Sequence, residues 1–175
     1  VYDESFSVNI SEEMLENLLL KQYPTINDEV FTKMQETIEE ARLNQNSVGG
    51  TIECAIINVP AGIGNPFFDS VEAHLSQLLF SIPAVKSVSF GLGEKITELY
   101  GSEANDSYYY DGDIVKTKTN NNGGILGGIS NGMPIVFKVG IKPTPSVSLK
   151  QDTINVKTKE NSTLEIKGRH DPCIV

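Results

Sequence analysis

A glycine- and asparagine-rich stretch from residue 120 to 132 constrains the fold more than any other part of the sequence. Five of its thirteen residues are glycine and four are asparagine. Glycine permits positive φ angles, asparagine tolerates left-handed conformations, and consecutive N–H groups in such a loop can form a concave anion site. Because Ile125, Leu126 and Ile129 lie within it, we expect an ordered loop packed on an apolar surface, although a long hairpin connection explains the glycines equally well. No Lys-Ser/Thr pair follows the glycines, so the stretch is not a P-loop.

The totals limit the classes of function. At 175 residues the chain is one domain or most of one, and its net charge of −9 argues against a general binder of nucleic acid or anionic membranes. No apolar run is long enough to cross a bilayer, no signal peptide is visible, and two distant cysteines indicate neither a disulfide framework nor a zinc site. We therefore expect a cytoplasmic protein. Because the chain starts without Met and stops after an apolar run, we also suspect a fragment.

The first 47 residues predict two helices. Ser11 can cap the first helix, which has acidic residues in its first turn and ends at Pro24. Asn27 or Asp28 caps the second helix, whose apolar residues recur at helical spacing as far as Asn44. An apolar stripe with charged residues opposite is typical of a helix that faces a core, so we assign no function to this part.

A strand, a helix and another strand are expected next. Residues 51–59 are rich in β-branched residues, and residues 84–90 form a second strand-like run. Between them, residues 68–80 predict a helix with Phe68 among its inward residues. This order predicts either a βαβ crossover or an antiparallel α+β equivalent. His74 lies beside the apolar stripe of the helix and is given no role.

The remaining segments predict short strands, which together indicate the α+β class. Three consecutive tyrosines, 108–110, predict an edge strand or alternatively a partner surface, because tyrosine is common at contacts. Residues 134–142 alternate with a period of two, which predicts a strand with one buried face. Two further strand-like pieces span residues 151–156 and 162–166.

Two clusters of polar residues are candidates for binding. Residues 142–146, Lys-Pro-Thr-Pro-Ser, combine a rigid backbone with one ammonium and two hydroxyl groups, as a ligand cradle would. Arg169, His170 and Asp171 stand together between a glycine and a proline. A solvated charged turn is the simpler interpretation of this second cluster, but the apolar residues that follow favour the edge of a core, where pKa values shift.

Four stretches, taken together, resemble motifs of the chorismate synthase family. They are residues 67–73 (FFDSVEA), 81–86 (SIPAVK), 121–132 (NNGGILGGISNG) and 168–173 (GRHDPC). They occur in the family's order, with residues 101–106 and 142–146 in place between them. The resemblance is strong over residues 48–175 and weaker over residues 1–47, and the ordered set is far more specific than any single piece.

The resemblance implies an FMN-dependent lyase of the shikimate pathway. Such an enzyme converts 5-enolpyruvylshikimate 3-phosphate to chorismate by 1,4-elimination of phosphate, and it needs reduced FMN although the reaction has no net redox change. The implied fold is a β-α-β sandwich, present here in part within the α+β class, and the usual assembly is a homotetramer. Whether the enzyme reduces its own flavin with NADPH or receives reduced FMN is left open.

The resemblance also assigns the site residues, and it implies no metal. The residues that match the family's flavin contacts are Pro83, Ala84, Gly127, Lys142, Pro143, Thr144, Pro145, Ser146 and Arg169. Lys142 would bind an anionic group, and Thr144 and Ser146 would offer hydroxyl groups. Asp171 matches the aspartate that acts as a base near flavin N5, and His170, the second catalytic residue, would help Arg169 to keep it ionised.

The sequence also departs from the family pattern. The family's arginine-rich N-terminal portion and the helix after the Asp-Pro-Cys motif are absent. Substrate and FMN together carry two carboxylates and two phosphates, while this chain has two arginines and a net charge of −9. We therefore expect the chain alone to bind flavin poorly and not to turn over. A non-catalytic flavin-binding or assembly fragment remains the alternative, and a net flavin oxidoreductase is a third possibility. The flavin interpretation expects the paired glycines, residues 142–146 and residues 169–171 to close on one pocket.

Overall fold

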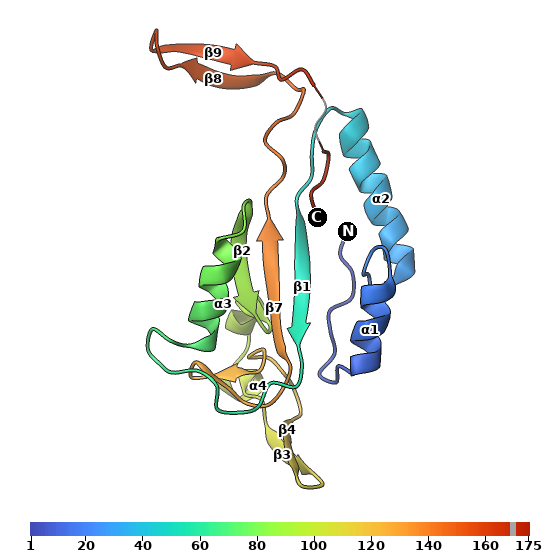
Figure 1. Ribbon diagram of the computed structural model, residues 1–175, viewed down its shortest axis with the longest axis vertical. Helices are drawn as coiled ribbons and strands as arrows, with labels where there is room; N and C mark the ends of the chain where they lie inside the picture. Colours follow the sequence, from blue (N-terminus) through green and yellow to red (C-terminus); the bar gives the residue numbers. More distant parts are fainter. Residues whose placement is uncertain (169–170) are drawn as a thin grey trace.

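The centre of the structure is a three-stranded antiparallel sheet. The computed structural model describes residues 1–168 and 171–175. Its sheet has the order β1-β7-β2, formed by β1 (Gly50–Ile56), β7 (Ile135–Ile141) and β2 (Val85–Phe90). Because β1 and β2 each pair antiparallel with β7, they run parallel to each other, and helix α3 (Val71–Phe80) connects them across one face (Figure 1). The fold is thus a βαβ crossover with an antiparallel strand inserted between its two strands, which confirms the α+β class.

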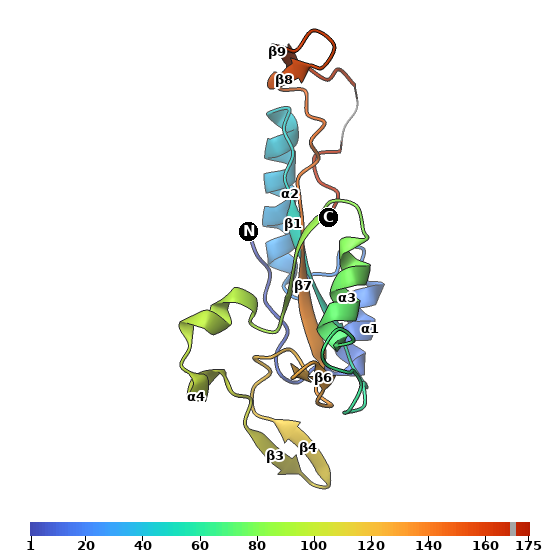
Figure 2. The same cartoon turned by 90° about the vertical axis from the view of Figure 1, so that its left-hand side faces the viewer.

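Shorter elements extend from both ends of this sheet. Two hairpins, β3–β4 and β8–β9, project at opposite ends of the molecule, and each pairs only its own two strands (Figures 1 and 2). The three tyrosines 108–110 lie in the first of these hairpins and are all exposed. The other elements are α1 (Glu12–Leu20), α2 (Asp28–Leu43), the 3₁₀ helix η1 (Gly93–Glu98), α4 (Gly101–Ala104), β3 (Tyr108–Asp111), β4 (Ile114–Thr117), β5 (Ile125–Leu126), β6 (Ile129–Ser130), β8 (Gln151–Asn155) and β9 (Glu160–Leu164).

The core lies between the sheet and α3. Ile135, Phe137 and Val139 of β7 are buried there, as the period-two pattern predicted, together with Val85 of β2 and Ile125 of the glycine-rich loop. Side chains of α3 complete the cluster, because residues four apart on a helix share one face. The partly buried side chains of α3 that pack against this core are Val71, Leu75 and Leu79. The core therefore joins the central strand, the helix and the glycine-rich loop into one packed unit.

The opposite face of the sheet carries the buried Val136 beside polar side chains, and the polar side chains bind the N-terminal segment. Glu53 of β1 and Lys138 of β7 are opposite each other, with 3.4 Å between Oε1 and Nζ. The Phe6 N–H donates to Glu53 (3.1 Å), and Lys138 donates to the Ser5 hydroxyl (2.9 Å). The same segment supplies Asp3 to the start of α2. The first six residues therefore tie the N-terminal helices to the sheet.

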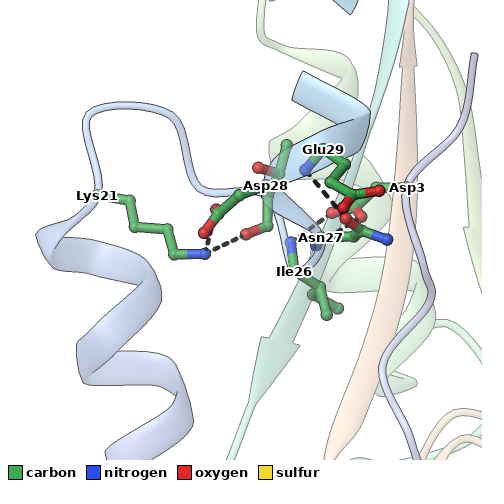
Figure 3. A network of polar contacts seen from close by, with 7 residues as sticks. Asp3, Lys21, Ile26, Asn27, Asp28 and Glu29 are labelled. Atoms are coloured by element: carbon green, nitrogen blue, oxygen red, sulfur yellow. Dashed lines mark hydrogen bonds and ion pairs between the residues drawn. The ribbon is translucent and has the colours of Figure 1, made fainter. Parts of the chain in front are cut away.

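The start of α2 is bound by side chains from the N-terminal segment and from the end of α1, as well as by its own cap (Figure 3). The Asp3 carboxylate accepts from the N–H groups of Ile26 (2.5 Å) and Asn27 (3.0 Å), and the Asn27 side chain caps the helix by accepting from the Glu29 N–H. Lys21, just after α1, donates to Asp28 at 2.7 Å. The free N–H groups at a helix start favour acceptors such as the Asp3 carboxylate and the Asn27 side chain. The predicted cap at Ser11 is confirmed, and of the two candidates for the second helix, Asn27 and Asp28, Asn27 is the cap.

Helix α3 begins later than the sequence predicted. The prediction of a helix from residue 68 with Phe68 facing inward is wrong: the helix starts at Val71, and the Phe68 side chain is 93% exposed. The cause is Ser70, whose hydroxyl accepts from the Ala73 N–H at 3.1 Å and so caps the helix two residues after Phe68. Phe67, which directly precedes Phe68, is also exposed, so the two phenylalanines form an apolar surface outside the core.

Two features are absent from the described part of the chain. Across residues 1–168 and 171–175, no helix combines the length and apolar character that a membrane span requires. In the same residues, no three histidine, cysteine, aspartate or glutamate side chains gather as metal ligands.

The core assignment predicts opposite results for two phenylalanines. Replacing Phe137, which is 6% exposed, with alanine should lower the free energy of unfolding by about 3–5 kcal/mol because it leaves a cavity. The matched control Phe68→Ala removes the same side chain from an exposed position and should change that free energy by less than about 0.5 kcal/mol. Denaturant unfolding of both variants measures the difference. Similar losses in the two variants would contradict the positions of both side chains.

Candidate functional site

Several of the predicted site residues meet where β7 ends and β1 and β2 begin. The Lys142 N–H donates to the Ala84 carbonyl at 2.9 Å, so the backbone pairing of β7 continues one residue past the strand. The Ser47 hydroxyl, just before β1, donates to the Thr144 carbonyl at 2.6 Å. These two bonds place residues 142–146 between the Pro83–Ala84 pair and the start of β1.

The end of the described chain returns to the same place. The Val48 N–H donates to the Pro172 carbonyl at 2.8 Å. A Cβ built on Gly50 would lie 2.8 Å from the Val175 side chain, so the tail packs directly on the first residue of β1. Asp171 therefore lies beside the same strand start as residues 142–146. We call Pro83, Ala84, residues 142–146 and residues 171–173 the strand-end cluster.

The strand-end cluster has groups that can bind a ligand. Lys142, Ser146 and Asp171 are exposed. The Thr144 hydroxyl is buried and finds no hydrogen-bond partner among the described residues. A buried polar group without a partner is uncommon in a folded protein and suggests a missing one. Ala84 has a φ of 72°, which is rare for a residue with a side chain and is often found at functional sites. The cluster thus offers a cation, hydroxyl groups and a carboxylate.

The glycine-rich loop lies at the other end of β7. Its middle is the β5–β6 hairpin, whose turn residues Gly127 and Gly128 have φ angles of 58° and 84°. Positive φ at both turn positions is typical of a tight hairpin turn that favours glycine. Gly128 is buried, with its carbonyl accepting from the Val71 N–H at 3.0 Å, whereas Gly127 is exposed and faces open space. The loop is therefore both the ordered, packed loop and the hairpin that the sequence allowed.

The structure does not bring Gly127 to the strand-end cluster. The seven residues of β7 separate the two regions, which places them about 20 Å apart at roughly 3.3 Å per residue. Figures 1 and 2 both show the two regions at opposite ends of this strand. Arg169 and His170, predicted as a flavin contact and a catalytic residue, lie outside the described residues. Within the described part of one chain, the expected pieces do not close on a single pocket.

A hollow beside the glycine hairpin was not anticipated from the sequence. It has a volume of about 510 Å³ and lies between the loop that precedes α3 and the first turns of that helix. His74 and Asp69 stand at its wall, with 3.3 Å between Nε2 and Oδ1, and both side chains are more than half exposed. An exposed pair of this kind contributes little energy. The residues that line the hollow are Ile63, Gly64, Asn65, Asp69, Val71, His74 and Leu75.

The start of the glycine-rich loop is bound to an internal carboxylate. Asp106 is 6% exposed, and its two oxygens accept hydrogen bonds from Thr119, Asn121 and Asn122. Burial alone would raise the pKa of Asp106, but the hydrogen bonds from the Thr119 hydroxyl and from the side chain and backbone of the asparagines outweigh it and lower the pKa below its usual value. Neither periodicity nor composition signalled this role, because Asp106 is one acidic residue in a polar turn.

This lowered pKa predicts how stability depends on pH. Because Asp106 binds protons less readily in the folded state, its charged form stabilises the fold at every pH above its unfolded pKa, about 4. That contribution disappears as the pH falls through the lower, folded pKa. The difference in unfolding free energy between the wild type and Asp106→Asn should be constant from neutral pH down to about pH 5 and should shrink below about pH 4. Denaturant unfolding across this range measures it, and a difference that grows in acid would refute the assignment.

Comparisons with known proteins agree on one family. The family model described as chorismate synthase matches residues 4–175. A chorismate synthase of Methanocaldococcus jannaschii is 48% identical over 176 residues, which cover 100% of this chain and 46% of that protein. One of Methanococcus aeolicus is 52% identical over 144 residues, covering 82% of this chain and 39% of the relative.

The fold gives the same answer. A crystal structure of chorismate synthase superposes with a TM-score of 0.69 and 32% sequence identity, over 75% of this chain and 40% of that one. The chain thus spans a little under half the length of the relatives that it matches. The matched residues include the N-terminal helices as well as the sheet and both candidate regions. The chain belongs to the chorismate synthase family.

Proposed function

We propose that this chain is the part of a chorismate synthase that supplies one wall of the flavin site. The enzyme would convert 5-enolpyruvylshikimate 3-phosphate to chorismate by 1,4-elimination of phosphate. The observation that carries the proposal is the strand-end cluster, because three segments far apart in sequence, at Ala84, Lys142–Thr144 and Pro172, meet at one end of the sheet. The resemblance assigns all three segments to the flavin and the catalytic aspartate.

The strand-end cluster fits a phosphate-bearing flavin. The exposed Lys142 ammonium suits an anionic group, and the partnerless Thr144 hydroxyl and the exposed Ser146 hydroxyl can donate hydrogen bonds. The prolines 143 and 145 restrict the backbone between these donors, which reduces the entropy lost on binding. Reduced FMN, when bound, would supply an electron to the substrate and recover it, so that no net redox change results.

Asp171 would act on the substrate rather than on the flavin. Its exposed carboxylate can accept the proton that leaves the substrate in the elimination. The bond between the Pro172 carbonyl and the Val48 N–H fixes the backbone next to it, so the backbone of Asp171 is held beside the start of β1. Arg169 and His170 belong to this proposal through the family resemblance alone, as a flavin contact and as the second catalytic residue.

The remaining site assignment is Gly127. Its exposed backbone, with no atom in the space that a side chain would occupy, would let a ligand touch the turn directly. The distance from the strand-end cluster means that this contact belongs to a different part of the site. We further propose a cytoplasmic homotetramer, in which residues from neighbouring copies adjoin each chain.

A non-catalytic role for the isolated chain is favoured by two observations. Phe67, Phe68 and Leu78 expose 89%, 93% and 67% of their surfaces, which suits a chain that works within a larger assembly. The net charge of −9 opposes the binding of a substrate and a cofactor that are both anions. The second candidate is therefore a flavin-binding or assembly part without turnover of its own.

The isolated chain should bind FMN weakly. Titration of the 175 residues with FMN, followed by flavin fluorescence, should show no saturation at concentrations that saturate the full-length Methanocaldococcus jannaschii relative, because the charges are not neutralised. Adding salt should improve the weak binding by screening this repulsion. Tight binding by the chain alone would show that residues outside it are dispensable for the flavin.

Turnover is tested in a chimera in which these residues replace the matching segment of the same relative. Under anaerobic reducing conditions it should release phosphate without stoichiometric use of reductant, and stoichiometric use would indicate a net oxidoreductase instead. Asp171→Asn should lower kcat by about 10²–10⁴-fold while FMN affinity stays unchanged, because a base is lost but no flavin contact is. The control Asp152→Asn, on the exposed hairpin strand β8, should be silent. An active Asp171→Asn chimera would remove Asp171 from the mechanism.

A further inference from the structure

Asp106 is an enclosed charge that no cation neutralises among the described residues. It follows α4 and precedes β3, and only 6% of its surface is exposed. None of the ion pairs in residues 1–168 and 171–175 includes it. A buried charge is costly unless hydrogen bonds replace the lost water. The reason for keeping a carboxylate here must therefore lie in the donors around it.

Four hydrogen bonds converge on this carboxylate, three from the glycine-rich loop and one from Thr119, the residue just before it. Oδ1 accepts from the Thr119 hydroxyl (2.7 Å) and from the Asn121 N–H (2.7 Å). Oδ2 accepts from the N–H (3.0 Å) and the side-chain amide (2.8 Å) of Asn122. Two consecutive backbone N–H groups directed at one anion form the concave site that binds phosphate in other proteins. Here the anion is part of the chain itself.

The bound turn is also where three segments touch through their backbones. The Leu92 N–H, just after β2, donates to the Asn121 carbonyl at 2.9 Å, and the Gly91 N–H donates to the Val136 carbonyl of β7 at 2.9 Å. A Cβ built on Gly123 would lie 2.5 Å from the Gly91 nitrogen, so no side chain fits between the segments. The position of the turn is therefore set by these backbone bonds, by Asp106, and by the side-chain amides of Asn120 and Asn121, which donate to the carbonyls of Pro134 (2.8 Å) and Glu103 (3.0 Å).

The same turn is connected directly to the β5–β6 hairpin, of which only the tip residue Gly127 is exposed. Gly124, two residues after the Asn121–Asn122 turn, accepts from the Asn131 N–H at 3.0 Å and so closes the base of the β5–β6 hairpin. Ile125 is buried in the core immediately after it, and Gly127 stands at the tip. A shift of the turn would therefore be carried along a short, rigid connection to Gly127.

We propose that Asp106 is a positioning residue: its carboxylate occupies the anion-binding turn at Asn121 and Asn122, fixes the glycine-rich loop and thereby places Gly127. The assignment of Gly127 to a flavin rests on the proposed function. The binding of the Asp106 carboxylate by the turn does not depend on it. An external phosphate is excluded from this turn as long as Asp106 is present. Removal of the carboxylate should turn the same N–H groups into a vacant anion site.

Chemical rescue tests the internal anion without any flavin. In Asp106→Ala, the amide hydrogens of Asn121 and Asn122 should exchange with solvent at least about tenfold faster than in the wild type, because each loses a charged acceptor. Added formate should slow this exchange again and raise the midpoint of unfolding, whereas chloride at equal ionic strength should do neither. The control Asp111→Ala removes an exposed carboxylate that pairs with Lys116 and should show no response to formate.

A second variant keeps the test decisive if Asp106→Ala folds poorly. Asp106→Asn preserves the side chain's size but replaces one acceptor with a donor, so it should accelerate the same amide exchange and formate should not reverse it. Exchange as slow as in the wild type in Asp106→Asn, or faster exchange in Asp106→Ala that formate leaves unchanged, would overturn the proposal.

The chimera separates this proposal from the proposed function. If both are right, Asp106→Ala in the chimera should weaken FMN binding by about tenfold or more, and formate should restore part of it. If formate rescues amide exchange but FMN affinity never changes, Asp106 still positions the loop and the assignment of Gly127 to the flavin is wrong. If the unmodified chimera binds no FMN, the proposed function fails while the exchange experiment still decides the role of Asp106.

Discussion

The hydrogen bonding of β7 on both of its edges is the constraint on which the rest of the structure depends. One face of this strand forms the core with α3, and the other holds Lys138, to which the N-terminal segment binds. Its first residue follows the glycine-rich loop, and its last residue leads into residues 142–146. Because the pairing continues to the bond between Lys142 and Ala84, the strand carries the segment to the start of β2. Both candidate regions thus owe their positions to a single central strand.

The separation of these regions by the length of β7 limits how a ligand can use them. A small group at the strand-end cluster cannot also touch Gly127 of the same chain, since about 20 Å of strand lies between them. Contacts with both regions require an extended ligand or residues from a second copy of the chain. Exposed apolar side chains such as Phe67 and Phe68 show that surfaces suited to further partners are present.

Local signals in the sequence predicted most helices and strands, but they did not predict which distant segments pair with each other. The cap at Ser11 was identified, and that of α2 was placed to within one residue, because capping depends on the next three residues; β7 was identified because its apolar residues alternate. The start of α3 was missed because an apolar Phe68 outweighed the cap at Ser70. Two features depend on contacts between distant residues, which sequence periodicity does not reveal. One is the insertion of β7 between β1 and β2, and the other is the binding of the Asp106 carboxylate to a loop thirteen or more residues away.

The β8–β9 hairpin has a consequence for how this family can vary. Its two strands bond to each other and project beyond the sheet, and every residue of β9 is exposed (Figure 1). Its opening therefore disturbs none of the central hydrogen bonds, and its amides belong to a separate, weaker cooperative unit. The Gln151 side chain at the base of this arm donates to the Pro145 carbonyl at 3.3 Å, but the strands themselves do not pair with β7. Evolution can therefore lengthen or shorten the arm while the register of the central sheet stays the same.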